Sequence, residues 1–215
     1  MPLAVNEIFY SIQGESSFAG HPCVFIRLSG CNLRCSYCDT RYAYDDGEEL
    51  EIPAILEKVR TYPCSLVEVT GGEPLLQNET PKLVYHLLEQ GFTVLLETNG
   101  SLDISKVDLR CVRILDVKCP SSGQAHFNDL TNLQRLTSRD EVKFVIGDRE
   151  DYEFAKQILK QLDAPPLDPS RIHFSPVFGG LKPDTLAQWI LTDHLPVRFH
   201  LQLHKTIWHP QLRGV

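Results

Sequence analysis

Three cysteines lie close together in one short stretch of this sequence. Cys31, Cys35 and Cys38 follow the spacing C-x3-C-x2-C, so their thiolates can face one small volume if the chain loops around it. Three cysteine ligands suit a [4Fe–4S] cluster that keeps one iron open. The alternative is zinc, which takes four ligands in structural sites and three plus water in catalytic sites. The nearest histidine, His21, precedes the cysteines across a predicted strand, so the cluster is the favoured interpretation.

The remaining cysteines show no such pattern. The chain has 7 cysteines in all, an odd number, and its N-terminus lacks a basic region followed by an apolar one. A disulfide framework is therefore a poor interpretation, and metal binding or catalysis a better one. The cysteines outside the cluster are predicted to be small buried hydrophobic residues: Cys23, Cys64, Cys111 and Cys119.

Length and composition predict one globular domain that spans residues 1–215. The 215 residues are 42% hydrophobic and 23% charged, which is enough to bury a sizeable core. The formal charge of -7 argues against a large contact with nucleic acid, because such contacts need a basic surface. No apolar run approaches the ~18 residues of a membrane helix. We therefore expect a cytoplasmic protein that binds neither membrane nor nucleic acid.

The apolar pattern alternates between strand-like runs and segments of helical spacing. Strands are predicted over these ranges: Pro22–Leu28, Leu66–Thr70, Phe92–Thr98, Val112–Val117, Glu141–Ile146, Arg171–Ser175 and Val197–Leu203. Helices are predicted between them: Ile52–Tyr62, Pro81–Gln90, Glu150–Leu162 and Pro183–Asp193. This alternation predicts an α/β fold with a parallel sheet and right-handed crossovers.

The chain is short for a complete eight-stranded barrel. Eight βα units take about 250 residues, and the links between the third and fifth predicted strands lack a strong helix. We therefore expect an incomplete barrel, or an open curved sheet of about six parallel strands.

Unusual residues follow the predicted strands directly. They fall in these segments: Cys31–Cys38, Thr70–Pro74, Glu97–Gly100, Asp116–Lys118, Ser175–Pro176 and His204–Lys205. Loops at the carboxyl ends of parallel strands converge at one edge of the sheet, where such folds place their chemistry. The sequence therefore predicts one site assembled from many loops.

The segment Thr70-Gly71-Gly72-Glu73-Pro74 is the second signal. A double glycine at a strand end lets a ligand approach the backbone closely, and a glutamate can accept hydrogen bonds from an ammonium group. Together with the cysteine loop, this segment resembles the radical S-adenosylmethionine (SAM) superfamily. That resemblance implies that SAM chelates the open iron, that the glycine loop holds its methionine amino end, and that Tyr37 lies along the adenine.

Further segments resemble the 7-carboxy-7-deazaguanine synthase family within that superfamily. They are Ser11–Ser16, Ala19–Gly20, Phe25–Gly30, Cys38–Thr40, Asp116–Gly123 and Leu201–Lys205. The resemblance implies a reduced, incomplete radical SAM (β/α)6-type barrel with parallel strands, and a homodimer. It also implies a carbon–nitrogen lyase of queuosine and 7-deazapurine biosynthesis that converts 6-carboxy-5,6,7,8-tetrahydropterin to 7-carboxy-7-deazaguanine with loss of ammonia.

The resemblance also assigns cofactors and a partner. Besides the [4Fe–4S] cluster and SAM, it implies a magnesium ion held by the substrate and by the hydroxyl of Thr40. It implies a one-electron donor such as flavodoxin or ferredoxin. The reacting radical derives from the cofactor, so no catalytic side chain is assigned.

Site residues follow from the same match, with chemical support for some of them. A guanidinium such as Arg27 pairs naturally with a substrate carboxylate, while an amide and a carboxylate suit a pterin edge. The predicted substrate-binding residues are Ile12, Gln13, Gly14, Glu15, Arg27, Thr70 and His204, the last on the final strand. The predicted SAM-binding residues are Tyr37, Cys38, Asp39, Gly72, Glu73, Asp116, Lys118, Ser121 and Ser175. Metal ligands are Cys31, Cys35 and Cys38 for the cluster and Thr40 for magnesium.

Three alternatives share the cysteine loop. A glycyl-radical activating enzyme has the same cysteine spacing but would lack the Gln13–Glu15 segment, Arg27 and the Asp39-Thr40 pair. A zinc-binding interaction module would use the cysteines structurally. A plain electron-transfer protein does not explain the Gly-Gly-Glu-Pro loop.

Overall fold

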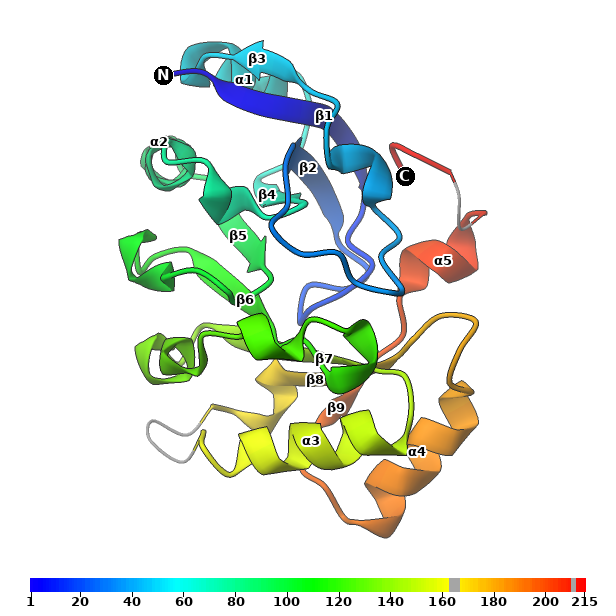
Figure 1. Ribbon diagram of the computed structural model, residues 1–215. Coiled ribbons are helices and arrows are strands. Elements are labelled where there is room, and N and C mark those ends of the chain that lie inside the picture. Colours follow the sequence, from blue (N-terminus) through cyan, green and yellow to red (C-terminus); the bar gives the residue numbers. More distant parts are fainter. Residues whose placement is uncertain (163–166, 210–211) are drawn as a thin grey trace.

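The computed structural model describes residues 1–162, 167–209 and 212–215. Within these residues one 9-stranded sheet has the order β3-β1-β2-β4-β5-β6-β7-β8-β9 (Figure 1). In this spatial order, the strands from β2 to β9 are parallel to their neighbours. At the other end of the sheet, β1 pairs antiparallel with both β2 and β3. The strands are β1 (Leu3–Ile12), β2 (Pro22–Leu28), β3 (Glu48–Leu50), β4 (Leu66–Gly71), β5 (Thr93–Thr98), β6 (Val112–Asp116), β7 (Glu141–Ile146), β8 (Ile172–Pro176) and β9 (Arg198–Phe199). The incomplete parallel-stranded barrel predicted from the sequence is confirmed.

The central strands are buried on both faces, as parallel sheets require. In β2, Val24 and Ile26 belong to a hydrophobic cluster that also contains helix residues, whereas Phe25 belongs to a second cluster with Leu95 and Ile114. Successive side chains of a strand point to opposite faces. One face of β2 therefore packs under helices, and the other faces the inside of the curved sheet.

The helices are α1 (Ile52–Arg60), α2 (Thr80–Glu89), α3 (Arg149–Leu159), α4 (Pro183–Thr192) and α5 (Leu203–Ile207). The first four lie where the sequence predicts them, because their apolar residues recur at helical spacing. In α2, for example, Leu83, Val84 and Leu87 are all buried. These helices cover the outer face of the sheet (Figure 1). Among the described helices, none is long and apolar enough to cross a membrane.

The links on either side of β6 contain only short 3-10 turns, as predicted. Residues 99–140, all of them described, form 3-10 turns at Ile104–Lys106, Pro120–Ser122, Ala125–Phe127 and Leu130–Arg135. This side of the barrel therefore lacks the α-helical cover that the other crossovers have.

The ends of the sheet differ from the prediction. Strands β1 and β3 lie at the edge, where their alternating or exposed side chains give little apolar signal. The predicted last strand, Val197–Leu203, is wrong in extent, since only Arg198 and Phe199 pair with β8. His204 therefore lies on α5 and not on a strand, because the Leu203 N–H donates to Gly14 O (3.0 Å) and turns the chain away from the sheet.

The connection between β1 and β2, residues 13–21, closes the open side of the barrel. Its Ser17 donates from both backbone N (3.0 Å) and Oγ to the Glu141 carboxylate at the start of β7. Its Gly14 carbonyl accepts from Leu203 N and contacts His200 Nε2 at 3.3 Å. Loop-to-strand hydrogen bonds thus replace the strand pairing of a complete barrel.

Candidate active site

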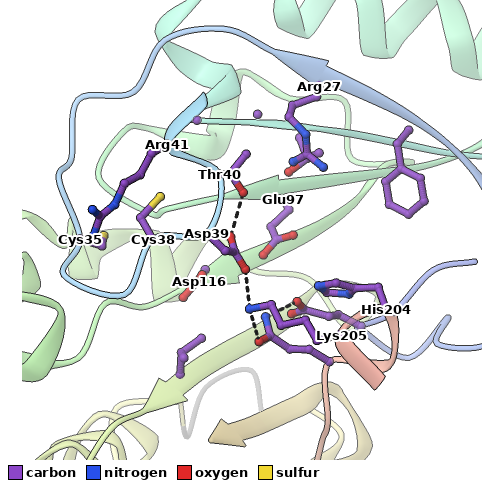
Figure 2. A pocket seen from close by; sticks show the side chains of 18 of the residues that line it. Arg27, Cys35, Cys38, Asp39, Thr40, Arg41, Glu97, Asp116, His204 and Lys205 are labelled. Carbon is purple, nitrogen blue, oxygen red and sulfur yellow. Dashed lines mark hydrogen bonds and ion pairs between the residues drawn. The ribbon is translucent and has the colours of Figure 1, made fainter. Parts of the chain in front are cut away.

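One cavity of about 730 Å³ opens at the carboxyl ends of the parallel strands. Figure 2 shows side chains from the cysteine loop, several strands and α5 directed around it. Its volume is within the range of small-molecule and cofactor sites. The convergence of loops predicted from the sequence is therefore present in the fold.

Cys31, Cys35 and Cys38 all line this cavity. The backbone of their loop is braced, with Cys38 N donating to Cys35 O (3.2 Å) and Ser36 N donating to Ser122 O (3.0 Å). Within the described residues, no three His, Cys, Asp or Glu side chains gather closely enough for a single metal ion. An iron–sulfur cube does not need such convergence, because each thiolate binds a different iron. The three thiols therefore fit the cluster predicted from their spacing.

The arginine in this loop holds its backbone. Arg34 Nη1 donates to Cys31 O and to Leu33 O, both at 2.8 Å, and the guanidinium lies 4.1 Å from the Tyr44 ring centroid.

Burial raises the pKa of the Cys31 and Cys35 thiols. A bound cluster would oppose that effect, because metal coordination deprotonates a thiol.

The Gly-Gly-Glu-Pro loop packs directly against the cysteine loop. A Cβ atom on Gly72 would lie 2.3 Å from Gly30 O and 2.6 Å from Cys31 Cβ, so only glycine allows this approach. Gly72 lines the cavity beside the cysteines. The loop thus places a stretch of backbone without a side chain in the cavity beside the cysteines.

Glu73 follows this glycine but lies outside the cavity lining. Its carboxylate is fully buried and accepts from Leu75 N (2.9 Å), Asn99 N (2.7 Å) and Thr98 Oγ1 (2.9 Å). Burial raises its pKa to about 7, although these hydrogen bonds oppose the rise. Glu73 therefore joins the loop to the end of β5, and its contact with SAM stays a prediction.

Tyr37, Asp116 and Lys118 line the cavity next to the cysteines. Lys118 Nζ pairs with Asp116 Oδ2 at 2.8 Å. Burial alone would lower the pKa of Lys118, but Asp116 and Tyr37 outweigh it and raise that pKa. Within the described chain, Tyr37 Oη and Asp116 Oδ1 are buried without a hydrogen-bond partner. Such orphaned polar atoms are the groups that a bound polar ligand would satisfy.

The two serines predicted to bind SAM lie outside the cavity lining. Ser121 donates from its backbone N to Asp151 Oδ1 (2.8 Å) and from its hydroxyl to the same carboxylate. Ser175 is fully buried in β8, and its hydroxyl has no hydrogen-bond partner in the described part of the chain. The structure therefore does not bring either side chain to the site, and their contact with SAM stays a prediction.

Thr40, the predicted magnesium ligand, lines the cavity just after the cysteine loop. Its Oγ1 donates to Asp39 Oδ1 (2.8 Å), and Asp39 Oδ2 pairs with Lys205 Nζ at 2.5 Å (Figure 2). The ion pair with Lys205 and the hydrogen bond from Thr40 lower the pKa of Asp39. A hydroxyl and an ionised carboxylate are oxygen donors of the kind that Mg²⁺ accepts.

Arg27 enters the cavity from β2. Its Nε donates to Glu7 Oε1 at 2.7 Å, and its guanidinium carbon lies 5.7 Å from the Phe9 ring centroid and 5.8 Å from that of Tyr42. Within the described residues, the terminal Nη groups make no hydrogen bond. They can still meet a carboxylate in the bidentate manner that the sequence predicts.

Gln13, Gly14 and Glu15 line the cavity together with Ile12 and Thr70. Gln13 Nε2 donates to Glu68 Oε2, and Gln13 Oε1 accepts from Glu15 N (2.9 Å), so its amide is already engaged within the protein. Glu15 Oε1 accepts from Gln202 Nε2 (2.7 Å). The structure thus assigns Gln13 a bracing contact that the sequence does not reveal.

His204 approaches Gly14 closely. A Cβ atom on Gly14 would lie 2.3 Å from His204 Nδ1, which explains the glycine between two polar side chains. Burial lowers the pKa of His204, so its imidazole is neutral at pH 7. It lines the cavity as predicted, although from a helix.

Sequence reasoning missed two ionisable residues of the cavity, Glu68 and Lys143, and included Glu97 only as part of the segment Glu97–Gly100 without a role. Glu68 and Lys143 each lie between two apolar residues of a buried strand. A charged side chain in the middle of a buried strand is the signal that could have revealed them, because such a charge is buried only with a partner.

Comparison with known proteins identifies the family. The profile of the radical SAM superfamily matches residues 25–189. A 7-carboxy-7-deazaguanine synthase from Chlorobaculum tepidum is 48% identical over 217 residues, which cover 100% of this chain and 98% of that protein. The chain belongs to the 7-carboxy-7-deazaguanine synthase family. A second member, from Koribacter versatilis, is 42% identical over 99% of this chain and 100% of its own length.

A solved structure agrees in fold. The crystal structure of QueE from Escherichia coli superposes with a TM-score of 0.80 at 23% identity and covers 94% of each chain. Membership of the radical SAM superfamily implies a [4Fe–4S] cluster and SAM as cofactors. The family found is therefore the one that the sequence resembles, and not one of the three alternatives raised by the cysteine loop.

Proposed function

We propose that this chain converts 6-carboxy-5,6,7,8-tetrahydropterin to 7-carboxy-7-deazaguanine with loss of ammonia, as a magnesium-dependent carbon–nitrogen lyase. The observation that carries the proposal is one cavity that combines three cysteine thiols with Arg27 and Glu15. The family relationship supports the same reaction.

The cysteine side of the cavity suits the cofactors. Cys31, Cys35 and Cys38 would hold the cluster, with Gly72 and the pair Asp116–Lys118 beside the open iron. When bound, the cluster and SAM would supply the radical chemistry of hydrogen abstraction. The protein's own contribution is to bind, to orient and to exclude water where that chemistry takes place.

The opposite side suits a carboxylated pterin. Arg27 would pair with the substrate carboxylate, while Glu15 and neutral His204 would meet the polar edge of the ring. Thr40 would contribute one oxygen ligand to a magnesium ion that also binds water and substrate oxygens. That ion would serve as a template and a Lewis acid.

The remaining parts of the proposal concern partners and organisation. We propose that an external one-electron donor such as flavodoxin or ferredoxin reduces the cluster, that the chain acts as a homodimer, and that residues 1–215 form a single radical SAM core domain. The loop bearing Cys35 also bears the exposed side chain of Arg34, so a donor can approach this side of the cavity.

An anaerobic assay tests the reaction. Reconstituted protein is incubated with SAM, a reductant, Mg²⁺ and 6-carboxytetrahydropterin, and the products are identified by mass spectrometry. We expect 7-carboxy-7-deazaguanine. Formation of 5′-deoxyadenosine without that product would overturn the substrate, and absence of both with an intact cluster would overturn the use of SAM.

A further inference from the structure

A buried lysine on β7 lies at the centre of the cavity's charges. Only 8% of the Lys143 side chain is exposed, and its neighbours Val142 and Phe144 are core residues. Its Nζ pairs with Glu15 Oε2, lies 2.7 Å from Glu97 Oε1 and lies 3.8 Å from Asp116 Oδ2. A lysine that is buried to this extent is stable only because these carboxylates surround it.

The same lysine links two segments that are distant in sequence. Glu15 belongs to the loop that closes the barrel, and Glu97 lies near the end of β5. Both carboxylates line the cavity, as does the lysine. Lys143 therefore fixes one wall of the cavity relative to the other.

A third buried carboxyl group, that of Glu68, serves as a comparison because no ion pair with Lys143 is found for it in the described residues. Glu68 on β4 is 3% exposed and accepts from the amide of Gln13, and within the described residues it takes part in no ion pair. Burial and the nearby Glu97 and Glu15 raise its pKa well above the usual range. Glu15 differs, because the ammonium group of Lys143, with which it pairs, outweighs burial and holds the pKa of Glu15 well below the usual range.

We propose that Lys143 is a positioning residue that keeps Glu15 ionised and directed into the cavity, so that Glu15 accepts hydrogen bonds from the amino-pyrimidinone edge of the ligand. This inference rests on the proposed function. An ionised carboxylate accepts only, and the adjacent ring N–H and exocyclic amino group of such a ring are both donors. A protonated Glu15 would lose that match.

Other charged and titratable groups also face Glu15. They are Lys143 on β7, Glu68 on β4, Glu97 on β5, His200 after β9, His204 on α5 and Asp39 after the cysteine loop. All of these except Lys143 stay in place when Lys143 alone is replaced. Loss of Lys143 also removes its effect on Glu68, Glu97, His200 and His204, so a second variant that adds Glu15→Gln is needed to separate the part that depends on Glu15.

Binding of the stable product tests the inference without turnover. We would measure the affinity of reconstituted protein for 7-carboxy-7-deazaguanine by calorimetry between about pH 6 and pH 9, for wild type, Lys143→Met and Lys143→Arg. Near pH 6 we expect Lys143→Met to bind the product roughly 10- to 100-fold more weakly than wild type does. This difference in affinity, the gap between the two proteins, should narrow as pH rises. In the variant, burial without a cation leaves Glu15 protonated at low pH, and rising pH ionises it again. Lys143→Arg should restore most of the affinity.

Two controls make the test selective. Lys156→Met removes a lysine that pairs with Asp193 (2.6 Å) on the outer surface, and should leave affinity unchanged. Adding Glu15→Gln to Lys143→Met should abolish the pH dependence of the gap, because no carboxyl group remains to titrate at residue 15. Equal affinity of Lys143→Met and wild type, or a gap that does not change with pH, would overturn the inference. Absence of binding by wild type at every pH would instead overturn the proposed function.

Discussion

Single side chains in and next to the cavity differ in whether the protein already uses their hydrogen-bonding groups. Glu73 and Gln13 are engaged by neighbouring protein groups, so they brace the loops that carry the site. Tyr37 and Asp116 instead present buried oxygen atoms that have no hydrogen-bond partner in the described residues. This difference separates residues that shape the cavity from residues that can meet a ligand.

The cysteine ligands can be tested one at a time. Replacement of Cys35 by Ala should leave a folded protein, since this side chain lies in a loop outside the hydrophobic clusters. The variant should lose the visible absorbance of the iron–sulfur cluster and reductive SAM cleavage, because a cube with two protein ligands is poorly held. The assay is formation of 5′-deoxyadenosine.

Cys64→Ser is the matched control for this prediction. Cys64 is also partly exposed, but it lies next to Pro22 and Leu66, away from the cavity. The Cys64→Ser protein should bind the cluster and cleave SAM as the wild type does. A Cys35→Ala protein with wild-type iron content and activity would contradict the cluster assignment.

Among the elements, the loop of residues 13–21 shapes the site directly. It closes the barrel through Ser17 and Glu141 and carries Glu15 into the cavity. The fully buried Glu141 also contacts His173 Nε2 at 2.8 Å. Burial alone would raise the pKa of Glu141, but its contacts with His173 and Ser17 lower it.

Replacement of Glu141 by Gln should loosen this loop and lower the free energy of unfolding by about 1–3 kcal/mol at neutral pH. Because the folded-state pKa of Glu141 lies below the unfolded value of about 4.3, its contribution is present above that value. The difference between wild type and variant should therefore shrink as pH falls through the folded-state pKa. Urea unfolding of iron-free protein at a series of pH values measures this difference in the free energy of unfolding.

Hydrogen exchange at residues 13–21 provides an independent measurement of the same effect. Exchange there should be faster in Glu141→Gln than in wild type, whereas the strands β4 and β5 should be unaffected. Uniformly faster exchange throughout the sheet would show that Glu141 supports the whole fold and not this loop.

At the scale of the molecule, the two largest hydrophobic clusters of the described residues lie along one continuous sheet. One contains β1, β2, β4, β5, α1 and α2 residues, and the other contains β6 to β8 with α3 and α4. The cysteine loop contributes no residue to either cluster. The sheet therefore does not depend on the metal for its core.

Removal of iron should accordingly leave the sheet folded. We expect far-ultraviolet circular dichroism to be unchanged after chelation, with a lower Tm and faster hydrogen exchange at residues 30–44, because ligand binding to the native state adds stability. Reconstitution with iron and sulfide should reverse both changes. Loss of secondary structure on chelation would contradict this separation of core and cluster.

Much of this architecture could be predicted from the sequence. The apolar runs at β2, β4, β5, β6 and β7 and the helical spacing of α1 to α4 reflect local burial, which hydrophobic periodicity records directly. The cysteine spacing and the double glycine likewise indicate chemistry that needs those residues. Strands β1 and β3 escaped prediction because most of their side chains are half-exposed or exposed and form no continuous apolar run.

Sequence patterns alone are enough to identify the family, the parallel sheet and the residue types that the site contains. Which of those residues meet depends on how the chain folds in space. The tertiary structure placed His204 on a helix against Gly14, left Ser121 and Ser175 outside the cavity, and joined Lys143 to Glu15 across the barrel. The physical reason is that periodicity and motif spacing act within a few residues, whereas hydrogen bonds and ion pairs depend on distances in space that chain folding alone creates.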